Sequence, residues 1–323
     1  VVWENVEKDY VYTDVINVDD GYIALSYDKI VKYSLDGKVL WDKELTLPSG
    51  VWNKMDKIDD GIIISSTTNI LIKTDFNGEE LWRVETGIDI DDMNCMNNQI
   101  FITRTYRSSE YVYSTIFNLE KYNSNGEKIA SNSKRGLNID SPFTTVSNDG
   151  IYMIGGSDYD GSYPIAKFDL EGNYLWSSRT SKDSIDYRDQ IFSQAIGTPD
   201  GGVIGYTRNE DYIVKYDKNG FLQLVINSED IGDNGRGIAC TNDGIVVVYN
   251  DGTVKKYDYG IKENLAESSN ENNGMLVWEN VEKNYSYKDV ISVNDGYVAI
   301  ASESATGAKD GGQIVKYDLQ GNV

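Results

Sequence analysis

Carboxylates are the main chemically active side chains of this chain. Its 323 residues include 52 Asp and Glu, 30 Lys and Arg, two Cys and no His. Without His there is no Ser-His-Asp or Cys-His catalysis and no His-ligated zinc. Two cysteines are also too few for a thiolate metal site. Any reaction at this surface would therefore depend on carboxyl groups.

Three of these carboxyl groups share one position of a repeated unit, near the start of its first strand: Asp14, Asp92 and Asp289. We expect them at the mouth of a central channel. A hydrolase or lyase would need two such groups facing a cleft. This geometry is the basis of an alternative hypothesis, a carboxylate-dependent carbohydrate-active enzyme.

Two acidic clusters in the connections between strands could bind calcium, the one possible cofactor. Asp89 and Asp91 form the first cluster, and Asp230 and Asp233 form the second. Neither cluster has the spaced ligands and closing Glu of an EF-hand loop. Carboxylates that only solvate a loop are the alternative.

The net charge of −22 narrows the range of partners. Nucleic acid and anionic membrane surfaces would be repelled by this field. The sequence also has no apolar run of eighteen residues, so we expect no direct membrane insertion. Cationic proteins, divalent ions and neutral sugars remain open as partners.

A recurring signature indicates the fold. It reads as an apolar pair, Lys and an aromatic residue, Asp-x-x-Gly, and often Trp four residues after the glycine, as in Ile30-Val31-Lys32-Tyr33, Gly37 and Trp41. The signature glycines are Gly37, Gly78, Gly126, Gly172, Gly220, Gly274 and Gly321. They are 41 to 54 residues apart, which is the range of propeller blades.

Each unit also has an earlier Asp/Asn-Gly turn before a β-branched run, and Asn97-Asn98-Gln99 takes its place in the third unit. We therefore predict four antiparallel strands a unit, with hairpin turns at Asp-Gly and Asp-x-x-Gly. The Trp after the second turn should pack between neighbouring blades. The Lys before that turn should form a solvated or snorkelling stripe.

The two ends of the chain are complementary. Trp3 to Ser26 aligns with the stretch 275 residues later, with 16 of 24 positions identical, so residues 1–6 match a last strand without its blade. Residues after Gly321 lack that strand. We predict one domain over residues 1–323, an all-β propeller of seven four-stranded antiparallel blades, closed by the N-terminal strand. A six-bladed ring followed by the start of another is the alternative.

Cys95 and Cys240 align at one position, in units three and six. Blades three and six are too far apart for a disulfide. We expect two buried free thiols.

Residues 77–87, with Gly78, Leu81 and Trp82, resemble the blade ending of pyrroloquinoline-quinone (PQQ)-type propeller repeats. Residues 200–206 and 212–217 are similar to repeats of secreted and surface-attached bacterial proteins. The resemblance implies a propeller in an extracellular or cell-surface bacterial setting. Quinone-dependent members hold their cofactor with adjacent cysteines, which this chain lacks, so we expect no quinone. Non-enzymatic relatives act as docking platforms.

We expect function on the face that carries the longer, dissimilar connections, because rigid scaffolds carry function on variable loops. Aromatic and arginine side chains there are candidate contacts for a protein or glycan. They are Trp52, Arg104, Tyr106, Arg107, Tyr159, Tyr163, Tyr187, Arg188 and Arg236. The leading hypothesis is a non-enzymatic binding scaffold, a monomeric domain of a larger protein. A purely structural repeat spacer is a further alternative.

Overall fold

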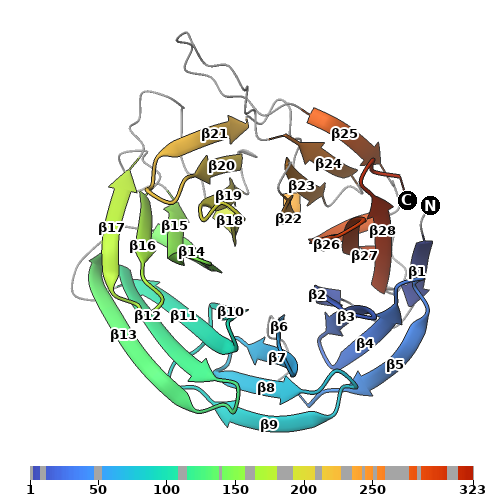
Figure 1. The fold of residues 1–323 in the computed structure, drawn as a ribbon, viewed down its shortest axis with the longest axis horizontal. Coiled ribbons are helices and arrows are strands. Elements are labelled where there is room, and N and C mark those ends of the chain that lie inside the picture. The colour runs from blue at the N-terminus through green and yellow to red at the C-terminus, as the bar shows by residue number, and fades with distance from the viewer. Residues whose placement is uncertain are drawn as a thin grey trace.

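The fold was analysed in a computed structural model. It describes residues 3–7, 12–46, 53–107, 115–137, 140–156, 164–179, 192–207, 213–226, 235–241, 244–249, 253–258, 276–281, 285–303 and 312–322. These residues form seven antiparallel sheets of four strands each, arranged in a ring (Figure 1). The prediction of a seven-bladed propeller is confirmed.

The strands follow one order in every blade, from the axis outward. The first four blades contain β2 (Tyr12–Val18), β3 (Gly21–Ser26), β4 (Lys29–Ser34), β5 (Val39–Glu44); β6 (Asn53–Ile58), β7 (Gly61–Ser66), β8 (Ile70–Thr74), β9 (Glu80–Glu85); β10 (Asp92–Met96), β11 (Gln99–Arg107), β12 (Thr115–Asn123), β13 (Lys128–Leu137); β14 (Asp140–Ser147), β15 (Gly150–Gly156), β16 (Pro164–Phe168) and β17 (Tyr174–Arg179).

The last three blades contain β18 (Phe192–Gly197), β19 (Val203–Thr207), β20 (Ile213–Tyr216), β21 (Leu222–Ile226); β22 (Gly235–Thr241), β23 (Gly244–Tyr249), β24 (Thr253–Tyr257), β25 (Leu276–Val281); β26 (Tyr285–Val293), β27 (Gly296–Glu303), β28 (Gly312–Asp318) and β1 (Trp3–Glu7).

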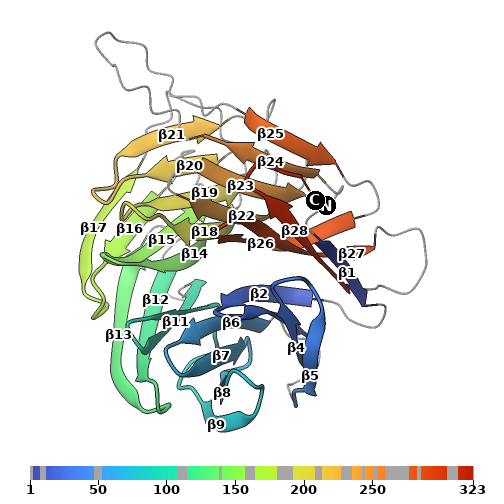
Figure 2. The ribbon, with the colours of Figure 1, turned by 45° about the vertical axis from the view of Figure 1, so that its right-hand side comes forward.

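The N-terminal strand closes the ring. β1 pairs antiparallel with β28, with Trp3 opposite Lys316 and Glu7 opposite Gly312, so the first residues form the outer strand of the last blade. The two chain ends lie side by side in both views (Figures 1 and 2). The predicted closure is confirmed, and the six-bladed alternative is excluded.

The core lies between the blades. Seven apolar clusters are found in the described residues, and each combines side chains of two neighbouring blades. One example joins Ile23, Leu25 and Ile30 of the first blade to Ile62 and Ile64 of the second. Both faces of the middle strands are therefore buried, as the continuous apolar runs of β3, β7 and β23 require.

The Asp-x-x-Gly turn has the predicted chemistry. Asp75 Oδ1 accepts hydrogen bonds from the backbone N–H groups of Asn77 and Glu79, each at 2.9 Å. Gly78 adopts φ +81°, a left-handed conformation that glycine adopts without steric cost. Asp169, Asp217 and Asp318 form the same turn, whereas Asn123 takes the place of Asp in blade three and Ser34 in blade one.

Where the outer strand carries Trp, this side chain packs against the turn of the next blade. Trp82 Nε1 donates to the Ser124 carbonyl of the next blade at 3.1 Å. A Cβ on Gly126 would lie only 3.2 Å from the Trp82 ring. The same packing pairs Trp41 with Gly78, Trp176 with Gly220, and Trp278 with Gly321. The prediction that Trp packs between blades is confirmed.

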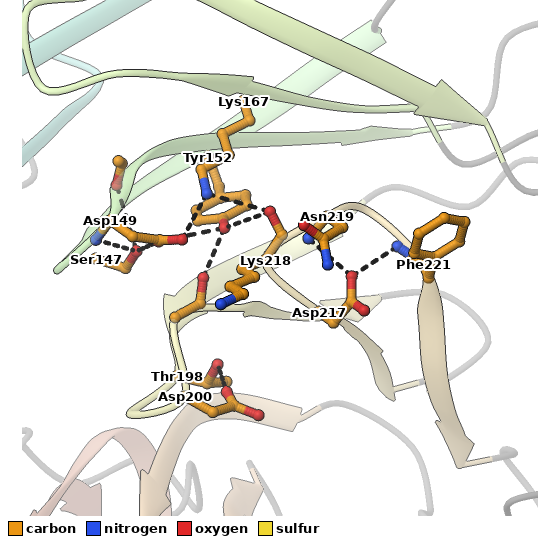
Figure 3. A network of polar contacts seen from close by, with 12 residues as sticks. Ser147, Asp149, Tyr152, Lys167, Thr198, Asp200, Asp217, Lys218, Asn219 and Phe221 are labelled. Atoms are coloured by element: carbon orange, nitrogen blue, oxygen red, sulfur yellow. Dashed lines mark hydrogen bonds and ion pairs between the residues drawn. The ribbon is translucent and has the colours of Figure 1, made fainter.

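Within the described residues, buried lysines make a second contact across four of the joints. Lys167 Nζ pairs with Asp149 Oδ2 at 2.5 Å and donates to the Lys218 carbonyl of the next blade at 3.1 Å (Figure 3). Tyr152 Oη donates to the Gly201 carbonyl at 2.6 Å. Lys32 reaches Phe76, Lys73 reaches Ser124 and Lys121 reaches Leu170 in the same way. The ion pair within the blade recurs between Lys32 and Asp20, Lys73 and Asp60, Lys215 and Asp200, and Lys316 and Asp295.

The lysine stems are thus buried and their ammonium groups reach the turns, as in snorkelling. The expectation of a solvated stripe is wrong, because the ammonium groups end in ion pairs and inter-blade hydrogen bonds.

Candidate functional site

Each innermost strand contributes one residue, located near the start of the strand, to a ring around the propeller axis. The register of the first two strands of every blade defines this axial ring, which consists of Asp14, Lys54, Asp92, Phe143, Gln194, Gly237 and Asp289. Six members pair with the residue four positions after the start of the second strand, and Gln194 pairs with Tyr206, three positions after the start of β19. The three predicted channel-mouth carboxylates therefore do share one position.

Asp14 and Asp289 meet where the first and last blades join. Asp14 accepts hydrogen bonds from the backbone N–H groups of Val15 at 2.7 Å and Met55 at 2.6 Å, one on each oxygen. Asp289 Oδ1 accepts the Val290 N–H at 2.9 Å. The Asp289 carboxyl group also contacts the Asp14 carboxyl group and the Gln194 side-chain amide. Burial raises the pKa of both carboxyl groups, and the charge of Asp289 further raises that of Asp14.

The two carboxyl groups consequently keep one proton between them at pH values above the ordinary pKa of Asp. Gly237, the ring member between Gln194 and Asp289, leaves space for this contact, since a Cβ there would lie 2.6 Å from the Asp289 Cα.

Lys54 and Asp92 complete the charged part of the ring. Lys54 Nζ pairs with Asp92 Oδ1, while Asp92 Oδ2 accepts from Thr144 Oγ1 at 3.3 Å. Burial opposes the charge of Lys54, but Asp92, Asp14 and Asp289 outweigh it and raise its pKa. Burial also raises the pKa of nearby Asp56 to about 6, although Cys95 N–H donates to it.

The shared proton predicts a pH dependence. In the unfolded chain Asp14 and Asp289 ionise near pH 4, whereas the folded pair keeps a proton above that pH. Raising the pH from about 4 therefore lowers stability until the pair itself ionises. Asp289→Asn retains the acceptor for Val290 and removes the charge that raises the Asp14 pKa, so its stability should fall less over this range.

Urea unfolding of both proteins at several pH values between about 4 and 8 checks this expectation. Parallel curves for the wild type and the variant would show that the pair holds no shared proton.

A second group lies at the end of β11, on the face where the connections enter the innermost strands. Residues 104–107 extend past the end of β10 and pair only with β12. Arg104 pairs with Asp89 and its guanidinium lies 5.9 Å from the Tyr106 ring centroid. Asp91 Oδ2 accepts the Thr105 N–H at 2.6 Å, and burial raises the Asp91 pKa. Tyr106 remains 43% exposed.

Comparisons with known proteins agree on the fold. No protein-family model matches the chain, and no curated protein matches it in sequence. BamB from Moraxella catarrhalis superposes with a TM-score of 0.52 and 14% identity, over 94% of this chain and 83% of BamB. The computationally designed Ika8 protein superposes with a TM-score of 0.60 and 11% identity, over 96% and 98% of the two chains.

At these identities the likeness shows the fold alone. The propeller implied by the resemblance to PQQ-type repeats is therefore confirmed, while membership of that family stays a prediction.

The structure brings together only part of the predicted loop face. Arg104 and Tyr106 are in contact, and only the backbone of Arg107 and Arg236 is described, in β11 and β22. Outside the described residues lie Trp52, Tyr159, Tyr163, Tyr187, Arg188, Asp230 and Asp233.

The acidic residues predicted as calcium ligands already have protein partners where they are described. Asp89 contacts Arg104 and Asp91 contacts Thr105. In the described ranges no three acidic, Cys or His side chains converge as a metal site would require. No helix in these ranges could cross a membrane. Calcium binding remains a prediction.

Both cysteines are free and at equivalent positions, as expected, since Cys95 pairs with Ile100 and Cys240 with Ile245. They are partly exposed rather than buried, because each lies close to the end of its innermost strand. Burial still raises the pKa of both thiols, that of Cys240 to about 11.

Sequence reasoning missed Lys54 and Gln194. Lys54 precedes Gly61 by seven residues, the same spacing as Asp14 before Gly21 and Asp92 before Gln99. The seven-residue spacing before the turn glycine could have identified Lys54. The turn before Gly202 is one residue longer, so the same spacing does not identify Gln194.

Proposed function

We propose that this chain is a non-enzymatic scaffold that binds a partner protein through its loop face. The observation that carries the proposal is the group at the end of β11, in which Asp89 holds Arg104 beside an exposed Tyr106 ring. Tyr and Arg are enriched at the centres of protein interfaces. A side chain already held in position loses less entropy on binding.

The surrounding charge favours this use of the group. A surface with a net charge of −22 offers few guanidinium groups, so Arg104 and Tyr106 form a distinct patch for an acidic or aromatic partner residue. The rigid inter-blade joints below the patch would hold it in place when the partner binds. A glycan could use the same ring by stacking on it.

Replacing Tyr106 tests this proposal. Tyr106→Ala should weaken partner binding by about tenfold or more, which corresponds to a loss of about 1.4 kcal/mol or more. The partner would be captured from the source cells or identified on a glycan array. Tyr174→Ala is the matched control, because Tyr174 on outer strand β17 is 38% exposed and has Lys134 Nζ 4.8 Å from its ring. Measuring array binding with calcium and with a chelator would distinguish metal-dependent from metal-independent recognition.

Equal binding by Tyr106→Ala, Arg104→Ala and the wild type would reject the patch as the contact surface. Loss of binding in Tyr174→Ala alone would place the contact on the perimeter instead.

We further propose an extracellular or cell-surface bacterial setting and a monomeric domain of a larger protein. This part rests on the resemblance of the repeat to those of surface-attached proteins. Fractionation of source cells followed by detection with an antibody would test it.

A carboxylate-dependent carbohydrate-active enzyme is the second candidate, favoured by the raised pKa of Asp14 and Asp289. Against it, both oxygens of Asp14 accept backbone N–H groups, which leaves Asp14 poorly placed to act on a substrate. Release of reducing ends or unsaturated sugars from polysaccharides, abolished in Asp289→Asn, would favour the enzyme.

A further inference from the structure

A pocket of about 680 Å³ opens on the opposite face of the ring, among the turns of the first three blades. Its apolar walls come from Val18 and Ile58, at the ends of β2 and β6, and from Phe76 in the turn before β9. Its polar side chains include Asp19, Lys57 and Asn97. The volume is typical of sites for small ligands.

The pocket walls are held by contacts between blades. On one side, Lys32 Nζ pairs with Asp20 at 2.8 Å and reaches the Phe76 carbonyl at 3.5 Å. On the other, the Asn98 side chain accepts the Asp59 N–H at 2.9 Å and donates to the Asp59 carboxylate. The pocket is therefore formed before any ligand binds.

The third blade departs from the repeat at this point. Asn97 and Asn98 replace the usual Asp-Gly turn and adopt φ +50° and +58°. Backbone in this region is uncommon for non-glycine residues and often marks functional sites. Here it directs Asn98 to Asp59 of the preceding blade, which leaves the neighbouring Asn97 amide at the pocket.

Opposite charges remain available around the pocket. Neither the Lys57 ammonium nor the Asp19 carboxylate has a hydrogen-bond or ion-pair partner within the described ranges. Lys32 and Asp20 neutralise each other, whereas the Asp59 charge contacts only a neutral amide. The charges that a ligand would meet are thus one ammonium group and the carboxylates of Asp19 and Asp59.

We propose that this pocket binds short peptides that have apolar side chains and free, oppositely charged ends. The peptide carboxylate would pair with Lys57 and the peptide ammonium with Asp19, while apolar side chains contact Val18, Ile58 and Phe76. Amide side chains such as Asn97 can both donate to and accept from peptide groups. The site is independent of the loop-face function proposed above.

Other ligand chemistries fit less well. A fatty acid could pair with Lys57 but would place its chain beside two carboxylates. An apolar cation would match Asp19 and Asp59 but would be repelled by Lys57. A sugar would leave its hydroxyl groups against Val18, Ile58 and Phe76 without partners.

Titration calorimetry with trileucine tests the proposal. Trileucine with free ends should bind saturably to the full chain, and triglycine should not. Lys57→Gln should weaken trileucine about tenfold but leave the affinity of the C-terminally amidated peptide unchanged. Asp19→Asn should weaken trileucine similarly and leave the N-acetylated peptide unchanged.

Lys218→Gln is the matched control, an exposed lysine in a turn on the same face but in the fifth blade. The thermal midpoints of all variants should match that of the wild type, because the replaced side chains are exposed. Absence of saturable trileucine binding, or equal affinity in Lys57→Gln, Asp19→Asn and Lys218→Gln, would overturn the proposal.

The two thiols give an independent readout. Cys95 lines the pocket, and Cys240 has the equivalent position in the sixth blade, outside it. Saturating trileucine should slow alkylation of Cys95 by a maleimide at about pH 7, where the peptide N-terminus is still charged, and leave Cys240 unaffected, as measured by mass spectrometry. Equal rates at Cys95 with and without the peptide would also overturn the proposal.

Discussion

Deleting residues 1–7 should destabilise the ring more than any single substitution proposed above. The deletion removes the five-residue ladder between β1 and β28, on the order of 5 kcal/mol at about 1 kcal/mol net for each hydrogen bond. It also leaves β28 as an open edge on which other chains can add a strand. We expect a lower urea midpoint and concentration-dependent association, measured by urea unfolding and light scattering.

A circular permutant provides the control. In blades one, two, four and six the outer strand has Trp four residues after the turn glycine, as Trp41 follows Gly37. Joining Val323 directly to Val2 places Trp3 four residues after Gly321 and reproduces this spacing. A permutant that starts at residue 8 should therefore recover the stability of the intact chain. Failure to recover would mean that β1 acts through something other than the ladder.

Gly220→Ala should cost about 2–5 kcal/mol of unfolding free energy. The residue adopts φ +83°, a conformation that costs an ordinary residue about 1–2 kcal/mol. Its Cβ would lie 2.5 Å from the Trp176 ring, and overpacking of this kind costs a further 1–3 kcal/mol. Urea unfolding of the variant and the wild type gives the difference directly.

Two further variants separate these causes. Lys218→Ala, in the same turn but exposed, should change stability by less than about 0.5 kcal/mol. In the Trp176→Leu background the cost of Gly220→Ala should fall toward that of the backbone alone, because the clashing ring is absent. Strict additivity of the two substitutions would show that the glycine does not contact the tryptophan in solution.

The fold could be predicted because its determinants are local. Asp75 and Gly78 form their turn within four residues, and the same spacing recurs along the chain, so one motif fixed the strand boundaries of most blades. The match between residues 3–26 and 278–301 was enough to predict ring closure, since strand pairing follows from register.

The sites were harder to predict because they depend on contacts between blades. Asp14 was a candidate from its position, but its neighbour Asp289 lies 275 residues away, and only the closed ring brings the two together. The pocket depends on Asn98 reaching Asp59 of the preceding blade. The sequence showed Asn97-Asn98 as a substitute turn and gave no indication of that contact. Asp89 was considered as a metal ligand, whereas its nearest cation is Arg104.

The joint between blades has a direction. One side presents Lys and, in most blades, Trp, such as Lys73 and Trp82, and the other presents the carbonyl groups and glycine of a turn, such as Ser124 and Gly126. Blades joined head to tail in this way form a closed ring when the rotations between successive blades add up to a full turn, whatever the number of blades. Gain or loss of a whole blade during evolution would leave every remaining joint with a matching partner, so only the angle between blades would have to adjust.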